Sequence, residues 1–504
     1  MGPMSVTAVR RACARIAALL GGILLYAGLL IPQDAAALPI FARQTGQNCL
    51  ACHAGGQFPE LTPYGRRFKL TGYTIGERTI PFAVMGVATY SKVANTDKDP
   101  DPQQTFAKNG SPLFAGGSLF IGGKITDNIG AFTQVSYDNY SGQAVGASGN
   151  NDGRWQSHTS ADNIDIRYAD HFIGPNQDLI VGVSLNNNPS VSDVWNTAAA
   201  WMQYVPGPSP GSSQFLDANA PYPDPGAGQV AGVTAYMLWN KTIYGELGFY
   251  RTANQAFSIM SAGTADADTT HLQGTNNPYW RLAYTHEWGA NNIMVGTSGM
   301  IAHILDPGSV TSDSNAYSRV KTIGIDSQYQ YLLDPHTVTV QAVYQRQTIN
   351  YSTNTVANFV PAYFLADGIT AIAAANPSDT INIFRAKASY VYQAKYGGSV
   401  GFFNRSSTTN TLNQTSGYDS NGQITYNDPL GTGISSTSTT GNLSGNSGTR
   451  GFTFETFWLP IQNVRIGAQY TAYNRFNGAS SNYDGLGRNA SDNNTLFLYV
   501  WGAY

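Results

Sequence analysis

The chain has 504 residues, of which only 28 are basic and 31 acidic, and it contains 54 Gly and 30 Tyr. Charged residues make up 12% of the chain, about half of the roughly 25% that is usual in soluble domains. A mean hydropathy of −0.22 excludes a polytopic helical membrane protein, since each spanning helix needs about 20 apolar residues. A pI of 6.1 without basic runs argues against a nucleic-acid-binding protein. The composition favours alternating strands with lipid outside and a polar space inside.

Residues 1–37 are predicted to be a signal peptide. Three arginines precede an apolar run at 16–31, and Ala35 to Ala37 fits a small-residue cleavage site. The alternative is an uncleaved membrane anchor, because this apolar run is near the upper length limit for a signal. Cleavage removes one of the three cysteines and leaves Cys49 and Cys52. We therefore expect an exported protein.

The two remaining cysteines belong to a C-x-x-C-H pattern, Cys49-Leu50-Ala51-Cys52-His53, which is typical of covalent c-type haem attachment. The spacing lets both thiols bond to one haem, and the adjacent imidazole can bind the iron. A disulfide or redox pair is the alternative, but it needs no histidine directly after it. We predict one covalent haem c, held by Cys49 and Cys52, with His53 as an axial iron ligand.

Residues 38–79 are predicted to be a short monohaem cytochrome c segment with one or two short helices. Its 42 residues are too few for a self-sufficient core, and Gly and Pro interrupt them repeatedly. We therefore expect this segment to enter the remainder of the chain from the periplasmic end, as a plug, so that other residues shelter the haem.

Residues 80–504 are predicted to form an all-β, transmembrane antiparallel barrel of the outer-membrane porin type. About sixteen stretches have period-2 alternation or β-rich composition. They lie at 80–92, 114–126, 129–140, 161–174, 179–189, 231–240, 242–253, 278–288, 291–305, 318–333, 336–351, 379–393, 398–410, 449–459, 463–477 and 494–504. Tight turns alternate with long polar connections, as in outer-membrane barrels with periplasmic turns and extracellular loops.

One strand illustrates the two faces that a barrel in lipid requires. Val464, Ile466 and Tyr470 are expected to face lipid, whereas Arg465 and Gln469 are expected to face the lumen. The chain also ends in an apolar, aromatic strand that resembles the C-terminal insertion signal of outer-membrane proteins. A periplasmic β-sandwich is the alternative, but its outer face would have to be soluble.

Three segments carry a resemblance to a known family: LPIFARQTG at 38–46, CLACH at 49–53 and FPELTPYGRRFKLTGY at 58–73. They resemble the fused monohaem cytochrome c–porins, the outer-membrane c-type cytochromes of iron-oxidising bacteria. The match covers about 36 residues, whereas the barrel resembles the family in type and length. The resemblance implies oxidation of extracellular Fe(II), with electrons passed across the outer membrane to a periplasmic carrier, a cytochrome or a copper protein.

Two other functions remain open from the sequence. The same haem-plugged porin could use another extracellular electron donor or acceptor, or it could serve as a transport channel. One-electron transfer through a haem needs no base or nucleophile, and the sequence contains no convincing catalytic triad or phosphate loop. The chain is therefore interpreted as an electron-transfer protein and, if an enzyme, as a one-electron oxidoreductase with Fe(II) as donor.

The second axial ligand of the haem iron has two candidates. Met85 shares a strand face with Thr89 and Ser91 and is expected to point inward; methionine ligation would raise the haem potential. His171 is the competing candidate, and an open or water-ligated iron is the third possibility. If neither residue binds the iron, we expect Met85 to pack against the plug and His171 to bond to Asp165 or to solvent.

Other charged groups have two interpretations each. Arg66 and Arg67 could bind the haem propionates, or they could dock onto lumen carboxylates such as Glu246 or Glu287. Scattered carboxylates in an extracellular loop could bind Fe(II) or belong to a solvated turn. They are Asp97, Asp99 and Asp101.

Overall fold

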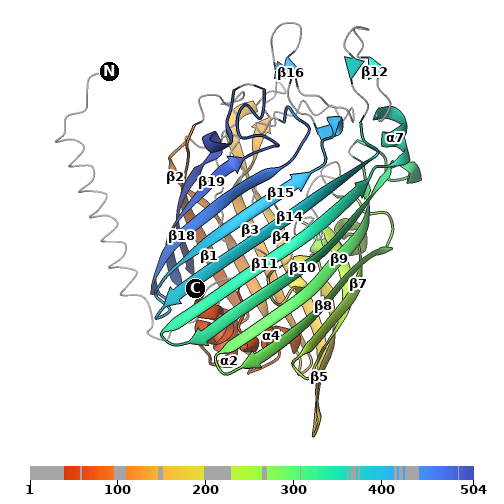
Figure 1. Cartoon of the computed structure of the whole chain (residues 1–504). Coiled ribbons are helices and arrows are strands. Elements are labelled where there is room, and N and C mark those ends of the chain that lie inside the picture. The colour runs from red at the N-terminus through yellow and green to blue at the C-terminus, as the bar shows by residue number, and fades with distance from the viewer. Residues whose placement is uncertain are drawn as a thin grey trace, which may run out of the picture.

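The computed structural model describes residues 39–504 apart from short gaps. The gaps are 57–59, 96–108, 146–150, 198–228, 264–269, 307, 360–362, 365–370, 373–374, 414–416, 419–423, 426–441 and 486. The described chain forms one closed barrel of sixteen antiparallel strands (Figure 1). The first strand, β1 (Phe82–Val93), pairs with the last, β20 (Thr495–Ala503), and this pairing closes the ring.

All sixteen predicted strands are confirmed, and each pairs with its neighbours in the chain. The other fourteen are β2 (Pro112–Lys124), β3 (Ile129–Val145), β4 (Asn151–Gly174), β5 (Gln177–Asn186), β6 (Val230–Trp239), β7 (Ile243–Thr252), β8 (Asn277–Trp288), β9 (Asn291–Leu305), β10 (Tyr317–Leu333), β11 (His336–Asn350), β14 (Ser378–Tyr392), β15 (Tyr396–Ser407), β18 (Thr449–Ile461) and β19 (Val464–Arg475). Two small hairpins outside the ring were not predicted, because strands of two residues have no periodicity. They are β12 (Tyr363–Phe364) with β13 (Ala371–Ile372), and β16 (Gly417–Tyr418) with β17 (Ile424–Thr425).

Strands β3 and β4 are longer than predicted. The sequence pattern ends β3 at residue 140 and begins β4 at residue 161, whereas backbone pairing continues to the pair Val145 and Asn151. Backbone hydrogen bonds do not require alternating side chains, so a hairpin that extends beyond the lipid can be polar on both faces. The extension therefore has no period-2 pattern in the sequence.

Exposure alternates along the strands as a barrel in lipid requires. On β10, Ile325 is 62% exposed, whereas the next residue, Asp326, is 4% exposed. On β19, Arg465 and Gln469 are buried inside and Tyr470 is exposed outside, which confirms the predicted faces. Ring closure leaves no unpaired edge among these strands, as lipid demands.

Aromatic side chains mark the end of the barrel where the short turns lie. Trp239, Trp288 and Tyr392 end β6, β8 and β14 next to these turns, and all three are exposed. Such a girdle is typical of the membrane–water interface of outer-membrane barrels. The closed ring, the apolar outer face and the girdle together identify an outer-membrane β-barrel.

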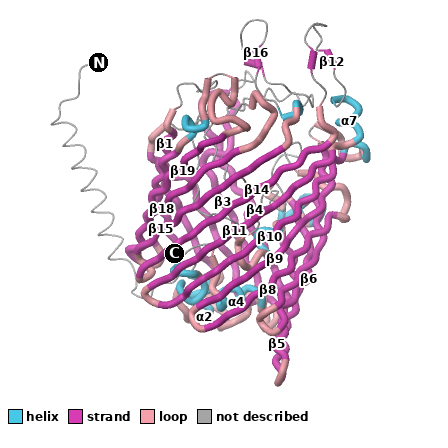
Figure 2. Tube along the Cα trace, viewed as in Figure 1, coloured by secondary structure: helices cyan, strands magenta, loops and turns pink. Residues whose placement is uncertain are grey.

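No helix in the described part of the chain is long and apolar enough to cross a bilayer. The helices are short, and the first three belong to the segment before β1 (Figure 2). They are α2 (Pro39–Thr45), α3 (Cys49–Cys52), α4 (Pro63–Leu70), α5 (Pro189–Ser192), α6 (Ala253–Ala256) and α7 (Thr353–Phe359), with 3-10 helices η1 (Ala54–Gly56), η2 (Ser258–Met260), η4 (Ser314–Ala316), η5 (Thr411–Asn413) and η6 (Ala490–Asn493). The predicted signal peptide lies outside the described residues.

Candidate functional site

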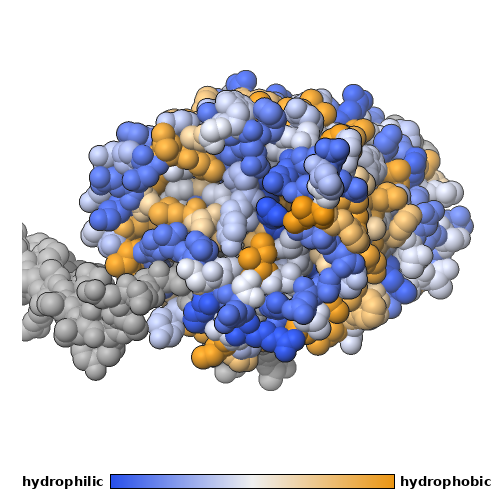
Figure 3. Space-filling model, turned by 90° about the horizontal axis from the view of Figure 1, so that it is seen from below, coloured by the Kyte–Doolittle hydropathy of each residue, from blue (hydrophilic) through white to orange (hydrophobic). Residues whose placement is uncertain are grey.

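Residues 39–79, which we call the plug, lie at the lower end of the barrel, near the short turns (Figures 1 and 2). Figure 3 views this end from below, where polar and apolar residues both reach the surface. The plug has three short α-helices and one 3-10 turn, rather than the one or two helices predicted. Side-chain caps define two of them, because Asn48 caps α3 and Thr62 caps α4 ahead of Pro63.

Cys49 and Cys52 begin and end α3, so one helical turn brings them to the same side. The side-chain oxygen of Asn48 accepts from the N–H groups of Leu50 (3.1 Å) and Ala51 (3.3 Å), which fixes this turn. Cys49 is 3% exposed, and its Sγ lies 3.2 Å from Oε1 of Gln462 in the turn between β18 and β19. The first cysteine of the C-x-x-C-H motif is therefore packed against the barrel wall.

The two cysteines are not joined by a disulfide. Burial raises the pKa of the Cys52 thiol to about 11. Redox-active C-x-x-C pairs depend on a thiolate with a lowered pKa, so this environment argues against the redox alternative. Two unbridged thiols in one helical turn fit covalent attachment to a porphyrin.

His53 follows α3 directly and leaves the helix in an extended conformation. Its backbone N–H donates to the carbonyl of Cys49 over 2.8 Å, and the residue pairs with Leu61 in an isolated β-bridge. These contacts fix the backbone of the imidazole-bearing residue relative to both thiols. The donor set of Cys49, Cys52 and His53 therefore fits a c-type haem.

Gly65 on α4 is a further residue of the site, and no local sequence pattern marks it. A Cβ atom at this position would lie 2.2 Å from the backbone oxygen of Cys52. Only glycine lets α4 approach α3 this closely, so the contact determines the position of the motif relative to the plug helix. The glycine is visible in the sequence, but its partner is not.

Side chains tie the plug to the inner wall on several sides. The pairs are Glu60 Oε1 with Lys387 Nζ at 2.5 Å, Tyr73 Oη with Asp165 Oδ2 at 2.6 Å, and Tyr236 Oη with the carbonyl of Leu70 at 2.8 Å. The barrel partners come from β14, β4 and β6. These contacts lie on the inner face of the barrel, where the segment was expected to lie as a plug.

Arg66 hydrogen-bonds to neither Glu246 nor Glu287, although the negative charge of Glu287 acts on the Arg66 guanidinium, whose pKa burial lowers and this charge raises. Its guanidinium donates to amide oxygens on the inner wall, and Glu246 accepts from a tyrosine instead. The partners are Asn292 (3.1 Å), Gln328 (3.3 Å) and Gln330 (3.2 Å) for Arg66, and Tyr244 (2.8 Å) for Glu246. Arg66 is thus occupied in holding the plug, which makes it a poor propionate ligand. For Arg67, binding to a haem propionate or to a lumen carboxylate stays a prediction.

Met85 and His171 occupy different surroundings. Met85 points inward on β1, as predicted, and packs against the apolar cluster that contains Cys49 and Trp501. It also packs against the cluster that contains Ile40 of the plug. His171 Nε2 lies 2.7 Å from Asp178 Oδ1. Its carboxylate partner is therefore Asp178 and not the predicted Asp165.

Within the described residues, no three His, Cys, Asp or Glu side chains are grouped so that they could hold a metal ion. Asp97, Asp99 and Asp101, the carboxylates considered for Fe(II), lie outside those residues.

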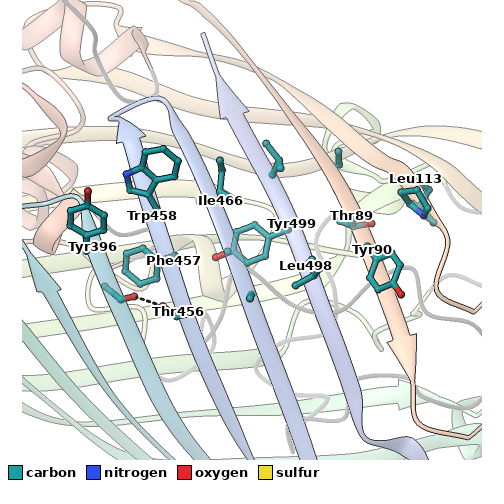
Figure 4. A pocket seen from close by; sticks show the side chains of 16 residues that line it. Thr89, Tyr90, Leu113, Tyr396, Thr456, Phe457, Trp458, Ile466, Leu498 and Tyr499 are labelled. Carbon is teal, nitrogen blue, oxygen red and sulfur yellow. Dashed lines mark hydrogen bonds between the residues drawn. The ribbon is translucent and has the colours of Figure 1, made fainter. Parts of the chain in front are cut away.

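A hollow on the barrel is formed mainly by outward-facing residues of β15, β18, β19, β20, β1 and β2 (Figure 4). Trp458, Leu498 and Tyr396 line it and are exposed on the outer wall. The hydroxyl of Thr456 donates to the carbonyl of Gly397 within it, over 3.4 Å. Because its lining is apolar and faces lipid, we do not assign it to the haem.

No protein-family profile and no curated protein matches this chain. Among solved structures it is similar to a loop L8 deletion mutant of OmpT, an outer membrane protein of Vibrio cholerae, at 9% identity and a TM-score of 0.38, covering 84% of this chain and 99% of that one. The outer membrane channel DcaP of Acinetobacter baumannii has 9% identity and a TM-score of 0.39, covering 84% and 96%. Salmonella typhi OmpF in complex with daunomycin has 10% identity and a TM-score of 0.41, covering 84% and 97%. At these values the likeness extends only to the general barrel architecture.

The close approach of Gly65 to Cys52 generates a prediction for Gly65→Ala. The added methyl group overpacks the contact and costs about 1–3 kcal/mol, so the motif opens more often. In haem-free protein refolded in detergent, maleimide labelling of the two cysteines should accelerate roughly tenfold. Gly245→Ala is the control, because its Cβ would meet nothing closer than Met237 Cγ at 3.9 Å. Equal labelling rates in Gly65→Ala and wild type would contradict the assignment.

Proposed function

We propose that this outer-membrane barrel is a monohaem c-type cytochrome that oxidises extracellular Fe(II) and passes the electrons to a periplasmic carrier. Cys49 and Cys52 hold the haem through thioether bonds, and His53 binds its iron. The observation that carries the proposal is the C-x-x-C-H turn, whose Cys49 packs against the inward-facing cluster of β20 inside a membrane barrel. The family resemblance of the plug supplies the donor and the direction of transfer.

A bound haem supplies a one-electron redox centre. The chain's own residues orient and shelter that centre. The Asn48 cap and the Gly65 contact set the geometry of the motif, and Phe497, Tyr499 and Trp501 of β20 form an apolar wall beside Cys49. An apolar surrounding excludes water and lowers the local dielectric, which helps to set the potential of a redox group.

Oxidation outside the cell suits ferrous iron. Fe(II) is soluble, whereas Fe(III) precipitates except in acid, so extracellular oxidation keeps the mineral out of the periplasm. A barrel then serves to present the redox centre across an insulating membrane. The same scaffold with another extracellular donor or acceptor is the second candidate.

The porin-like barrel by itself is also compatible with a transport channel. The anchoring of the plug argues against that alternative, because Glu60, Arg66 and Tyr73 are buried and bonded to the barrel wall. A segment held this firmly narrows the periplasmic end and would hinder a solute larger than an ion.

For the second axial ligand we propose Met85. It points inward, and it packs against the cluster that contains Cys49. His171 is paired with Asp178, which in turn lies 3.4 Å from Lys241 Nζ. Ligation by His171 would require breaking this arrangement, whereas ligation by Met85 breaks no polar bond.

The donor can be tested on intact cells that express the full chain. Fe(II) added outside should reduce most of the haem that dithionite reduces, as followed by the α-band of the c-type spectrum. Cys49→Ala/Cys52→Ala should contain no covalent haem by haem staining after denaturing electrophoresis. Reduction by dithionite but not by Fe(II) would overturn the donor and leave the cytochrome. Wild-type protein without covalent haem would overturn both.

Met85→Ala tests the axial ligand independently of the donor. Ferric wild-type protein should have the weak far-red absorption band of sulfur ligation, and the variant should lack it and have a lower midpoint potential, because methionine ligation raises the potential. Met294→Ala is the control, since Met294 is a buried lumen methionine in a different cluster. A wild-type spectrum without the band, or a band that survives in Met85→Ala, would contradict the assignment.

A further inference from the structure

The connection between β5 and β6 begins with a segment that folds into the barrel. Every residue from Asn187 to Thr197, which we call the lumen loop, is buried. The loop follows the end of β5 that lies away from the short turns, where an extracellular loop would be expected to project into water. Its helix, α5, is capped by the side chain of Asn188.

Inward-pointing side chains from three strands bind the backbone of the lumen loop. The bonds are Arg167 of β4 to Ser192 O (3.2 Å), Gln328 of β10 to Trp195 O (3.1 Å) and Gln341 of β11 to Asn196 O (3.4 Å). Lys69 of the plug also donates to the carbonyls of Val191 and Asp193. The loop therefore connects the plug with opposite parts of the wall.

Trp195 is the central side chain of the lumen loop and is 1% exposed. Two guanidinium groups lie over its ring, that of Arg66 of the plug at 5.8 Å and that of Arg281 of β8 at 5.4 Å. Tyr244 of β7 contacts it edge-on, with ring centroids 5.2 Å apart. Such contacts are stabilising in a desolvated arrangement, so they hold Trp195 in place.

Charged side chains around the lumen loop are shielded from water. Arg281 lies 2.7 Å from Asp326 and 3.4 Å from Asp193, and none of the three side chains is more than 1% exposed. Arg167 and Asp165 form a second pair at 2.8 Å with no exposure at all. Lumen charges in a water-filled porin would be hydrated, and burying them is costly unless they are paired. This part of the lumen is packed with protein.

A second loop packs into the barrel mouth. Residues 476–494, the mouth loop between β19 and β20, place Phe476 and Tyr483 in a cluster with the inward-facing Ile383 and Phe403. Its Arg488 and Asp484 lie 3.7 Å apart and are each 1% exposed. The mouth loop thus packs against a wall sector that includes β14 and β15, and the lumen loop against a sector from β4 to β11.

We propose that the lumen loop and the mouth loop seal the barrel on the extracellular side of the plug, so that it conducts no ions with or without haem. Trp195 is the positioning residue of this seal, because it joins the plug to β7 and β8. This seal against ion flow would exist whether or not the protein oxidises Fe(II). If both hold, the electron and not the ferrous ion crosses the barrel.

Single-channel recording in planar lipid bilayers tests the seal with the full chain. Wild type and the haem-free Cys49→Ala/Cys52→Ala variant should both give no porin-like current steps. Trp195→Ala should give current steps and raise the mean current at least tenfold. Trp458→Ala, which removes a tryptophan from the lipid-facing wall, is the matched control and should stay closed.

A second variant covers the case in which Trp195→Ala does not fold. In it a Gly-Ser linker of equal length replaces residues 189–196, and folding is verified by heat-modifiable electrophoretic migration. Porin-like currents in wild type would overturn the proposal. So would currents in the haem-free variant, because the seal would then depend on haem. A folded linker variant that stays closed would also overturn it.

Discussion

The buried ion pair between Glu60 of the plug and Lys387 of β14 is the interaction on which this structure depends most. Its atoms are 2.5 Å apart, and the two side chains are 4% and 10% exposed. A short segment without its own core cannot bury a carboxylate unless a cation meets it. The barrel supplies that cation, and this couples the fold of the segment that carries the C-x-x-C-H motif to the fold of the wall.

The same dependence extends to the other contacts of the plug. Arg66 finds its acceptors on β9 and β10, and the hydroxyl of Tyr73 finds Asp165 on β4. The interior of this barrel therefore serves as a binding surface for the chain's own plug. A barrel interior of this kind would suit a redox group, because such a group needs a fixed position and a surrounding of controlled dielectric constant.

The strands could be predicted from the sequence because lipid and lumen impose opposite polarity on alternate residues. The motif at Cys49, Cys52 and His53 was equally visible, since its spacing is local. Contacts between distant residues were not predictable. The amide partners of Arg66 are more than 220 positions away in the sequence, and nothing in a glycine such as Gly65 identifies the carbonyl it approaches.

The inward course of the lumen loop was also hidden. Its Ser, Asn and Pro residues have the composition of an extracellular loop, and only the wall partners Arg167, Gln328 and Gln341 make its burial possible. Polar residues can be buried where their hydrogen bonds are satisfied, so composition alone does not determine which loops project into water.

Hydrogen exchange of the full chain in Lys387→Met tests most directly whether the barrel holds the plug in its folded state. Losing one partner of a buried pair costs about 3–5 kcal/mol. Amides of α3 and α4 should then exchange roughly a hundredfold faster or more, while those of β10 and β11 keep their wild-type rates. Adding Glu60→Gln removes the unpaired charge and should restore much of the protection. Wild-type exchange rates in α3 and α4 of Lys387→Met would contradict the account.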